Sequence, residues 1–275
     1  MMKLRYIGFP IKDGCHKDGA DKGINKLKDI IHFDEIINIE EKDNDLDTVI
    51  HNDLKLASLV DKYQKDGFIP VTIGGDHSLA IGSIAGSSSN NEIAVIWLDT
   101  HPDSNTNETT VTFNIHGYPL AASMGFGQKE LTNLYQNKTK VNYKDVVMFA
   151  IDDIDKPEQE LIDKYGIKNY TLNDINSKAL DACIEETIEY LKDKKVHISF
   201  DIDSIKYDDS PGVNVKNNYG RGITKSDALK AFEEFNKKLN VVSIDIVEYN
   251  PLNDIDDKSK NIVLDAINII NEIHN

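Results

Sequence analysis

The sequence predicts an α/β fold in which a mostly parallel sheet lies between helices on both of its faces. Short apolar runs alternate along the chain with longer amphipathic segments, and such alternation is typical of a parallel sheet. The length of 275 residues and the apolar fraction of 40% are sufficient for a large buried core. Because no internal repeat, proline-rich linker or change of composition divides the chain, we expect residues 1–275 to form one domain.

Eight apolar runs predict the strands of this sheet. Each run is short, rich in β-branched residues and apolar almost throughout. Near-continuous apolarity is typical of strands that are covered on both faces. The predicted strands are Leu4–Phe9, Phe33–Ile39, Phe68–Ile73, Ile93–Asp99, Asp145–Ile151, Lys168–Thr171, Val196–Asp201 and Val241–Val247.

Helices are predicted where apolar residues recur every three or four positions and so form one stripe along a helix. The segments with this pattern are Ile24–Ile31, Leu56–Tyr63, Leu180–Leu191 and Ile262–Ile273. Two polar stretches, Asn105–Thr112 and Lys206–Asn218, are rich in Asn, Asp, Thr and Gly and are expected to be loops. Long loops in a compact α/β domain are often functional.

Composition excludes several classes of partner. The net charge of −16 argues against binding to nucleic acid or to an anionic membrane, because both need a basic face, and it is compatible with a cationic ligand. No apolar run approaches the roughly 18 residues of a membrane span, and the start of the sequence lacks the pattern of a secretion signal. Cys15 and Cys183 form no metal or disulfide motif, so we expect plain side chains in a cytoplasmic protein.

Residues of the types that bind metals follow four of the predicted strands. The segments are GGDHS at 74–78, DTHPD at 99–103, DID at 201–203 and DIVEYNP at 245–251. In an open α/β sheet, ligands bind in the crevice beyond the carboxyl ends of the strands. We therefore expect the four segments to converge in that crevice.

The spacing of these residues predicts a metal centre. Side chains at alternate positions of an extended segment point the same way, so the three polar residues of the second segment share one side, as do the two aspartates of the third. Crowded carboxylates repel one another, and bound cations would relieve the repulsion. Each segment alone has an ordinary explanation as a helix cap or a surface acid, but six such residues together suit two ions of Mn²⁺, Zn²⁺ or Fe²⁺. The six are His77, Asp99, His101, Asp103, Asp201 and Asp203.

The same four segments resemble the signature blocks of the ureohydrolases, the family that includes arginase, agmatinase and formimidoylglutamase. Their order and approximate spacing match across most of the chain, and the glycine-rich opening from Gly8 to Gly23 is also similar. The resemblance implies a three-layer α/β/α fold with an eight-stranded parallel sheet and two Mn²⁺ ions per subunit. It also implies the ligand assignment: His77 and Asp103 on one ion, His101 and Asp203 on the other, and Asp99 and Asp201 on both.

The stretch after Asp103 resembles arginase more than agmatinase. By this resemblance Asn105, Thr112 and Asn114 would hold the carboxylate of an amino-acid substrate, and Asp155 would recognise its α-amino group. The implied substrate is a small cationic guanidino compound, L-arginine above all, which would yield L-ornithine and urea.

The resemblance also implies the catalytic roles. Glu248 would pair with the guanidinium group, His116 would shuttle protons to solvent, and Asp103 would carry a proton to the leaving amine. Water activated by the two ions would attack the guanidinium carbon. Because the family commonly forms trimers or hexamers, we expect a homo-oligomer.

Some residues depart from the family pattern. Ser204–Tyr207 replaces a glycine followed by an Asp-Pro pair, Asn214–Lys216 replaces a Gly-Thr-Pro segment whose threonine lines the guanidinium pocket, and Arg221 replaces a glycine. The changed loop at Ser204–Lys216 favours the alternative of a ureohydrolase for formiminoglutamate, agmatine or another guanidino acid. Another alternative is a metal-binding homologue without turnover. A deacetylase of acyl-amines shares the fold, but its single-zinc, His-His pattern is not found in the sequence.

Overall fold

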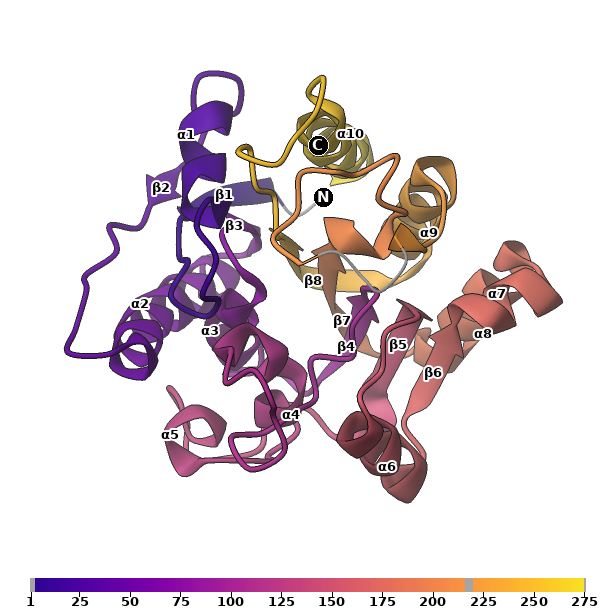
Figure 1. Ribbon diagram of the computed structural model, residues 1–275, viewed down its shortest axis with the longest axis horizontal. Helices are drawn as coiled ribbons and strands as arrows, with labels where there is room; N and C mark the ends of the chain where they lie inside the picture. Colours follow the sequence, from indigo (N-terminus) through magenta and orange to yellow (C-terminus); the bar gives the residue numbers. More distant parts are fainter. Residues whose placement is uncertain (1–2, 216–219, 275) are drawn as a thin grey trace.

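The computed structural model describes residues 3–215 and 220–274, and a parallel sheet of eight strands lies at its centre (Figure 1). The strand order is β2-β1-β3-β8-β7-β4-β5-β6, and every neighbouring pair is parallel. The strands are β1 (Lys3–Phe9), β2 (Glu35–Ile36), β3 (Phe68–Gly74), β4 (Ile93–Leu98), β5 (Val146–Ile151), β6 (Lys168–Thr171), β7 (Lys195–Asp201) and β8 (Asn240–Val247). The predicted fold class and all eight predicted strands are confirmed.

The second strand is much shorter than the predicted range of Phe33–Ile39. It forms only two register pairs with β1, Ile7 with Glu35 and Gly8 with Ile36. Both of its residues are exposed, because β2 lies at the edge of the sheet and no neighbouring strand covers it. Only part of this apolar run therefore pairs as a strand at the edge of the sheet, and the rest is irregular chain.

The helices connect successive strands and cover the sheet. They are α1 (Gly23–Leu27), α2 (Asp45–Lys65), α3 (Ala80–Ser87), α4 (Pro119–Ser123), α5 (Lys129–Thr132), α6 (Lys156–Tyr165), α7 (Leu172–Lys178), α8 (Leu180–Leu191), α9 (Lys225–Lys238) and α10 (Lys258–His274). The four predicted helices are present, but α1 ends early at Leu27, and α2 begins eleven residues before the predicted Leu56. The early turns of α2 are polar and are started by an Asn44 cap, whose side chain accepts a 2.9 Å hydrogen bond from the NH of Asp47. Within 3–215 and 220–274, no helix is long and apolar enough to cross a membrane.

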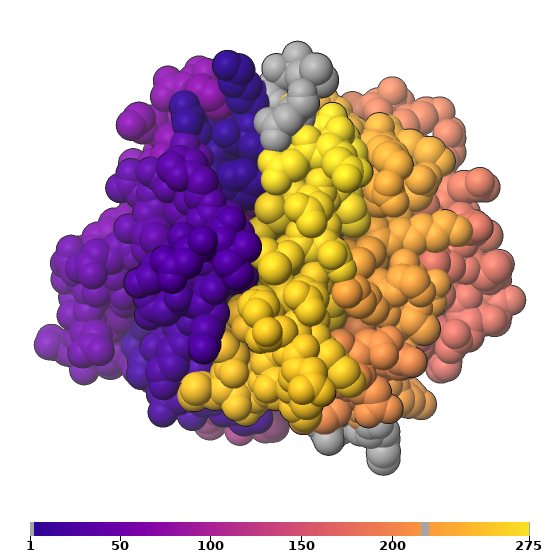
Figure 2. Space-filling model, turned by 90° about the horizontal axis from the view of Figure 1, so that it is seen from above, coloured from indigo at the N-terminus to yellow at the C-terminus, as the bar shows by residue number. Residues whose placement is uncertain are grey.

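Two helical layers enclose the sheet. On one face, α1, α8, α9 and α10 contribute Ile24, Ile184, Phe232 and Ile262 to the largest apolar cluster. On the other face, α2, α3, α4 and α6 cover the sheet with two further clusters. Figure 2 shows that α10 lies on the surface between the N-terminal segments and α9. The arrangement is a three-layer α/β/α fold.

The four strands that precede the polar segments are the four central strands of the sheet. In the order β3-β8-β7-β4, the register pairs Val71 with Ile244, Ile244 with Ile198, and Ile198 with Ile96. Because these strands are parallel, their carboxyl ends lie at one edge of the sheet. The fold thus brings together segments that are up to about 170 residues apart in sequence, as the 171-residue separation of His77 and Glu248 illustrates.

Candidate active site

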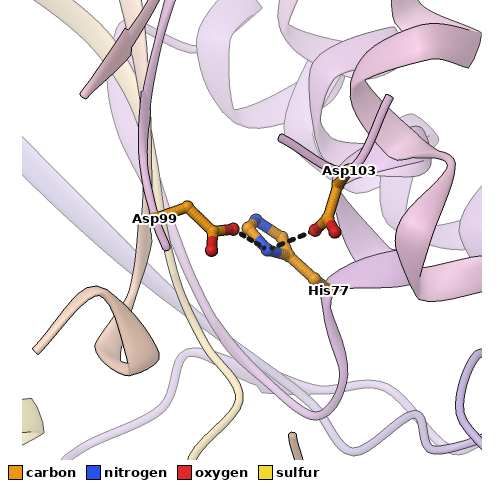
Figure 3. A group of neighbouring side chains, drawn as sticks. All are labelled: His77, Asp99 and Asp103. Atoms are coloured by element: carbon orange, nitrogen blue, oxygen red, sulfur yellow. Dashed lines mark ion pairs between the residues drawn. The ribbon is translucent and has the colours of Figure 1, made fainter. Parts of the chain in front are cut away.

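A buried imidazole lies among three carboxylates at the carboxyl edge of the sheet. His77 begins the short 3-10 helix η2 (His77–Leu79) after β3, and its Nδ1 atom lies 3.0 Å from Asp99 Oδ2, 3.1 Å from Asp103 Oδ2 and 3.2 Å from Asp201 Oδ2. Figure 3 shows the His77 ring between Asp99 and Asp103. The side chains of His77 and Asp99 are fully buried.

A second imidazole extends this cluster toward solvent. The Nδ1 atom of His101 lies 3.0 Å from Asp203 Oδ2 and 3.6 Å from Asp99 Oδ1. Two groups therefore offer atoms close enough together to hold a cation, and Asp99 belongs to both: His77 with Asp99 and Asp103, and Asp99 with His101 and Asp203. The structure brings all six residues of the predicted metal centre together.

Two residues that were not predicted fix the orientation of His77. Its Nε2 atom lies 2.8 Å from Ser199 Oγ, and its ring stacks on Trp97 with centroids 4.0 Å apart and planes only 6° apart. The Trp97 indole NH in turn donates a 3.1 Å hydrogen bond to the carbonyl of His101. A bond from Nε2–H to the Ser199 oxygen leaves the lone pair of Nδ1 facing the carboxylates, as a metal-binding imidazole requires.

The electrostatics of the cluster fit divalent cations. Burial, followed by repulsion from Asp99, raises the pKa of Asp203 to about 7, and burial together with Asp203 and Asp99 raises the pKa of Asp201. His77 Nδ1 and Asp99 Oδ2 are both buried. Although they lie 3.0 Å apart, neither atom has a partner in hydrogen-bonding geometry among the described residues. Oxygen and imidazole donors of this kind suit two ions such as Mn²⁺, Fe²⁺ or Zn²⁺, which would remove the repulsion and satisfy both atoms.

Glu248 and His116 lie beside this cluster and are hydrogen-bonded to each other. Glu248 Oε1 accepts a 2.8 Å hydrogen bond from the backbone NH of His77 and lies 3.0 Å from His116 Nδ1. Burial raises the pKa of Glu248, but the bonds from His116 and His77 outweigh burial and lower it below the ordinary value. Its other oxygen, Oε2, is buried and makes no hydrogen bond within the described part of the chain.

The backbone is bent at two of these acids. Asp103 has a φ of 42° and Glu248 a φ of 69°, values that are uncommon for residues with a side chain. The Glu248 NH donates a 2.9 Å hydrogen bond to the carbonyl of Gly75, so this conformation is held by the turn after β3. Unusual backbone conformations of this type cluster at functional sites.

Cys15, for which the sequence indicated no role, lies against His116. Gly14, just before it, accepts a 2.9 Å hydrogen bond from the His116 NH and donates one of 2.9 Å to Asp76. A Cβ atom at Gly14 would lie 2.3 Å from Asp76 Oδ1, so this approach requires glycine. Burial lowers the pKa of His116, but hydrogen bonds with Cys15 and Glu248 raise it well above the ordinary value.

A cavity of about 220 Å³ opens above the cluster. Its lining includes most of the residues predicted to bind a substrate or a metal: His101, Asp103, Asn105, Thr112, Asn114, His116, Asp155, Asp201, Asp203 and Glu248. His77 and Asp99 lie beneath it, and Asp153, Glu158 and Val215 are further lining residues that were not predicted.

The predicted substrate-binding residues lie at the mouth of this cavity. The Asn105 amide donates a 3.1 Å hydrogen bond to Asp155 Oδ2, and Asn105 Oδ1 accepts a 2.9 Å bond from Thr109. Glu158 fixes the same wall, because its carboxylate accepts 3.0 Å bonds from the NH groups of Ser104 and Asp155. The acid-rich segment Asp152–Glu158 was the signal in the sequence that could have indicated Glu158 as well as Asp155.

The two predicted loops form parts of the cavity wall. The loop at 105–112 contributes Asn105 and Thr112. The described part of the other loop contributes Val215, at the position where the family resemblance leads us to expect a threonine, while Lys216, Asn217 and Asn218 lie outside the described residues. An apolar side chain thus lines the pocket at this position.

Comparison with known proteins gives consistent results. The Arginase family model matches residues 7–273. An arginase of Bacillus caldovelox is 33% identical over 285 residues, which cover 94% of this chain and 94% of the relative. The crystal structure of an arginase from Bacillus subtilis superimposes with a TM-score of 0.89 at 32% identity and covers 98% of both chains. An arginase from Entamoeba histolytica in complex with L-ornithine has a TM-score of 0.88 at 29% identity, over 98% of this chain and 97% of that one.

Proposed function

Because this chain belongs to the arginase family of guanidino and amidino hydrolases, we propose that it hydrolyses L-arginine to L-ornithine and urea. The observation that carries the proposal is the position of Glu248: it lines a cavity together with His101, Asp103 and Asp203 of the two candidate metal groups, and its Oε2 atom makes no hydrogen bond within the described residues. A buried carboxylate with one free oxygen is a suitable partner for a guanidinium group. The L-ornithine complex of the Entamoeba histolytica relative supports the choice of substrate.

We further propose that the cofactor is a pair of Mn²⁺ ions. His77 and Asp103 would bind one ion, and His101 and Asp203 the other. Asp99 and Asp201 would bridge both. The membership of Asp99 in both groups and the 3.2 Å distance from Asp201 Oδ2 to His77 Nδ1 support the bridging roles. When bound, two such ions would make a water molecule nucleophilic at neutral pH.

The remaining steps fall to side chains of this chain. Glu248 would hold the guanidinium by charge-assisted hydrogen bonds, with its Oε1 atom kept in place by His77 and His116. Asp103, which lies at the cavity wall, would carry a proton to the leaving amine. His116 would then exchange protons with solvent, since its imidazole lines the cavity and contacts Glu248.

The amino-acid end of the substrate would lie at the cavity mouth. Asn105, Thr112 and Asn114 would bind the carboxylate, and Asp155 the α-amino group. The 3.1 Å hydrogen bond between Asn105 and Asp155 supports this division, because it puts an amide donor beside an acid acceptor at one end of the cavity. The α-amino and carboxylate groups of an amino acid need such a donor and such an acceptor within a few ångströms of each other.

A substrate panel tests the proposal. Protein loaded with Mn²⁺ is assayed for urea release from L-arginine, agmatine and 4-guanidinobutyrate, and for formamide release from formiminoglutamate. We expect the highest kcat/KM with L-arginine, and Asp99→Ala or Asp201→Ala should abolish turnover. Undiminished release by either variant would refute the assigned bridges, and a higher kcat/KM for another compound would refute the choice of substrate.

One observation favours a second candidate, a ureohydrolase for another guanidino acid. Val215 offers no hydroxyl where the family resemblance implies a threonine at the guanidinium pocket, so a differently placed substrate would suit this wall. Turnover of any compound in the panel distinguishes both candidates from a metal-binding homologue without activity. The trimeric or hexameric state and the cytoplasmic location remain predictions from the sequence.

A further inference from the structure

An ion pair joins Arg221 to Asp152, which directly precedes the cavity-lining residue Asp153. The Arg221 Nε atom donates a 2.8 Å hydrogen bond to Asp152 Oδ2, and Nη2 contacts Oδ1 of the same carboxylate. A guanidinium that uses two nitrogens on one carboxylate fixes its partner's direction as well as its distance. The Asp152 side chain is only 6% exposed and that of Arg221 is 53% exposed, so the arginine covers the acid.

Arg221 lies at the base of the loop that carries Val215. The two ends of this loop are bonded to each other: the Lys206 NH donates to Ile223 O at 2.9 Å, and the Ile223 NH donates to Ser204 O at 3.1 Å. A Cβ atom at Gly222 would lie 2.6 Å from the Lys206 nitrogen, which shows how closely the ends approach. Arg221 therefore projects from a fixed base directly beyond the segment Asp201–Asp203.

Asp152 adjoins the acids that line the cavity. The NH groups of Asp152 and Asp153 both donate to the carbonyl of Thr100, at 2.9 and 3.0 Å, which holds this segment against the strand end between Asp99 and His101. Asp153 and Asp155, just beyond Asp152, line the cavity. A shift of Asp152 would thus move the acids at the mouth.

From this geometry we propose that Arg221 is a positioning residue that holds the acids Asp153 and Asp155 in place at the cavity wall. By holding Asp152, it fixes the Asp153–Asp155 wall relative to the backbone that follows Asp203. It thereby selects substrates that carry charged groups at the end remote from the guanidinium. This specificity role rests on the proposed function, whereas the coupling of Arg221 to Asp152 and its neighbours does not.

The kinetic test compares two substrates in wild type, Arg221→Ala and a control. We expect Arg221→Ala to raise KM for L-arginine about fivefold, as for the loss of roughly 1 kcal/mol of binding, with kcat changed less than twofold. KM or Ki for butylguanidine, which lacks the amino and carboxylate groups, should stay unchanged. Lys206→Ala, which removes a surface ion pair with Asp209 in the same loop, is the matched control and should behave like wild type. Equal changes for both compounds would overturn the specificity role.

A double-mutant cycle and amide exchange test the coupling without turnover. If Arg221 acts through Asp152, the variant with both Arg221→Ala and Asp152→Ala should bind L-ornithine no more weakly than Asp152→Ala alone. Hydrogen exchange of the Asp152 and Asp153 amides should accelerate in Arg221→Ala but not in Lys206→Ala. Additive losses, or unchanged exchange, would overturn the coupling. Failure of the wild type to hydrolyse any guanidine would refute the proposed function, and the exchange result would still decide the coupling.

Discussion

The backbone NH of His77 donates a 2.8 Å hydrogen bond to Oε1 of Glu248, across the neighbouring strands β3 and β8. The bond links the candidate metal centre to the candidate guanidinium partner, because His77 offers its ring to the first and its backbone to the second. The same oxygen faces His116 Nδ1, so only Oε2 remains for a ligand. A guanidinium bound at Oε2 would need the negative charge of Glu248, whereas the hydrogen bond from His77 to Oε1 needs only an acceptor.

Replacing the charge of Glu248 should affect substrate binding but not the amount of bound metal. We expect Glu248→Gln to lower kcat/KM for L-arginine about 10²–10³-fold, because a buried charge pair with the substrate is lost. Mn²⁺ content, measured by plasma emission spectroscopy, should stay at the wild-type value. Glu248→Gln with near-normal kcat/KM would show that another group holds the guanidinium.

Metal addition should stabilise the fold. At a free Mn²⁺ concentration a hundredfold above Kd, the melting temperature should rise by about 5–10 °C, because the ions bind only the folded protein. Chelation with EDTA should reverse the increase. In Asp201→Ala the increase should shrink or disappear, and an unaltered thermal shift in that variant would remove Asp201 from the metal centre.

His116 should affect turnover more than binding. We expect His116→Asn to lower kcat about a hundredfold with KM within about threefold of wild type, since proton transfer is lost while Glu248 remains. Exogenous imidazole should restore part of kcat by supplying the missing proton carrier. A large rise in KM without a fall in kcat would instead assign His116 to substrate binding.

Asn105 should distinguish substrates that carry a carboxylate. Asn105→Ala is expected to raise KM for L-arginine while leaving that for agmatine, which has no carboxylate, nearly unchanged. Because the Asn105 amide also donates to Asp155, a smaller rise for agmatine through its amine is compatible with the geometry. Equal rises for both compounds would remove the reason for assigning the carboxylate to Asn105.

A buried acid far from the cavity should control stability at low pH. Burial raises the pKa of Asp61, but bonds from Lys65, Ser89, Tyr135 and Asn90 outweigh it and lower the pKa to about 2. Since the folded-state pKa lies below the unfolded value of 3.8, this stabilisation is full above pH 4 and is lost as pH falls through about 2.

We therefore expect Asp61→Asn to lower the free energy of unfolding by about 1–3 kcal/mol at pH 7, measured by urea denaturation. The difference between variant and wild type should narrow as pH falls from 4 toward 2. A difference that is independent of pH would show that the charge of Asp61 is not responsible.

The candidate metal ligands could be predicted from the sequence because the ligands of each segment lie close together along the chain. Asp99, His101 and Asp103 lie within five residues at the end of one strand, so they stay close together, although a turn with a φ of 42° at Asp103 replaces the extended alternation that we predicted. The strand order β3-β8-β7-β4 could not be predicted in this way, since no short segment encodes which strands become neighbours. The family resemblance supplied that information for the sheet.

Residues that act through long-range contacts were not predictable in the same way. Ser199 resembles an ordinary polar residue in an apolar strand until β3 brings His77 to 2.8 Å from it. Cys15 and Arg221 likewise acquire partners only in the folded chain, at His116 and Asp152. The predicted length of β2 was wrong for the opposite reason: its local apolarity was sufficient for a strand, but an edge position offered only one partner.

The central position of β3, β8, β7 and β4 also affects how this protein unfolds locally. Strands at the rims of a sheet, here β2 and β6, are the first to fray in subglobal fluctuations, and the middle strands open last. Metal ions bound at the ends of these middle strands would therefore be insulated from such fraying. Loss of ions through unfolding would require cooperative disruption of the whole sheet, so edge truncations should weaken the fold well before they weaken metal retention.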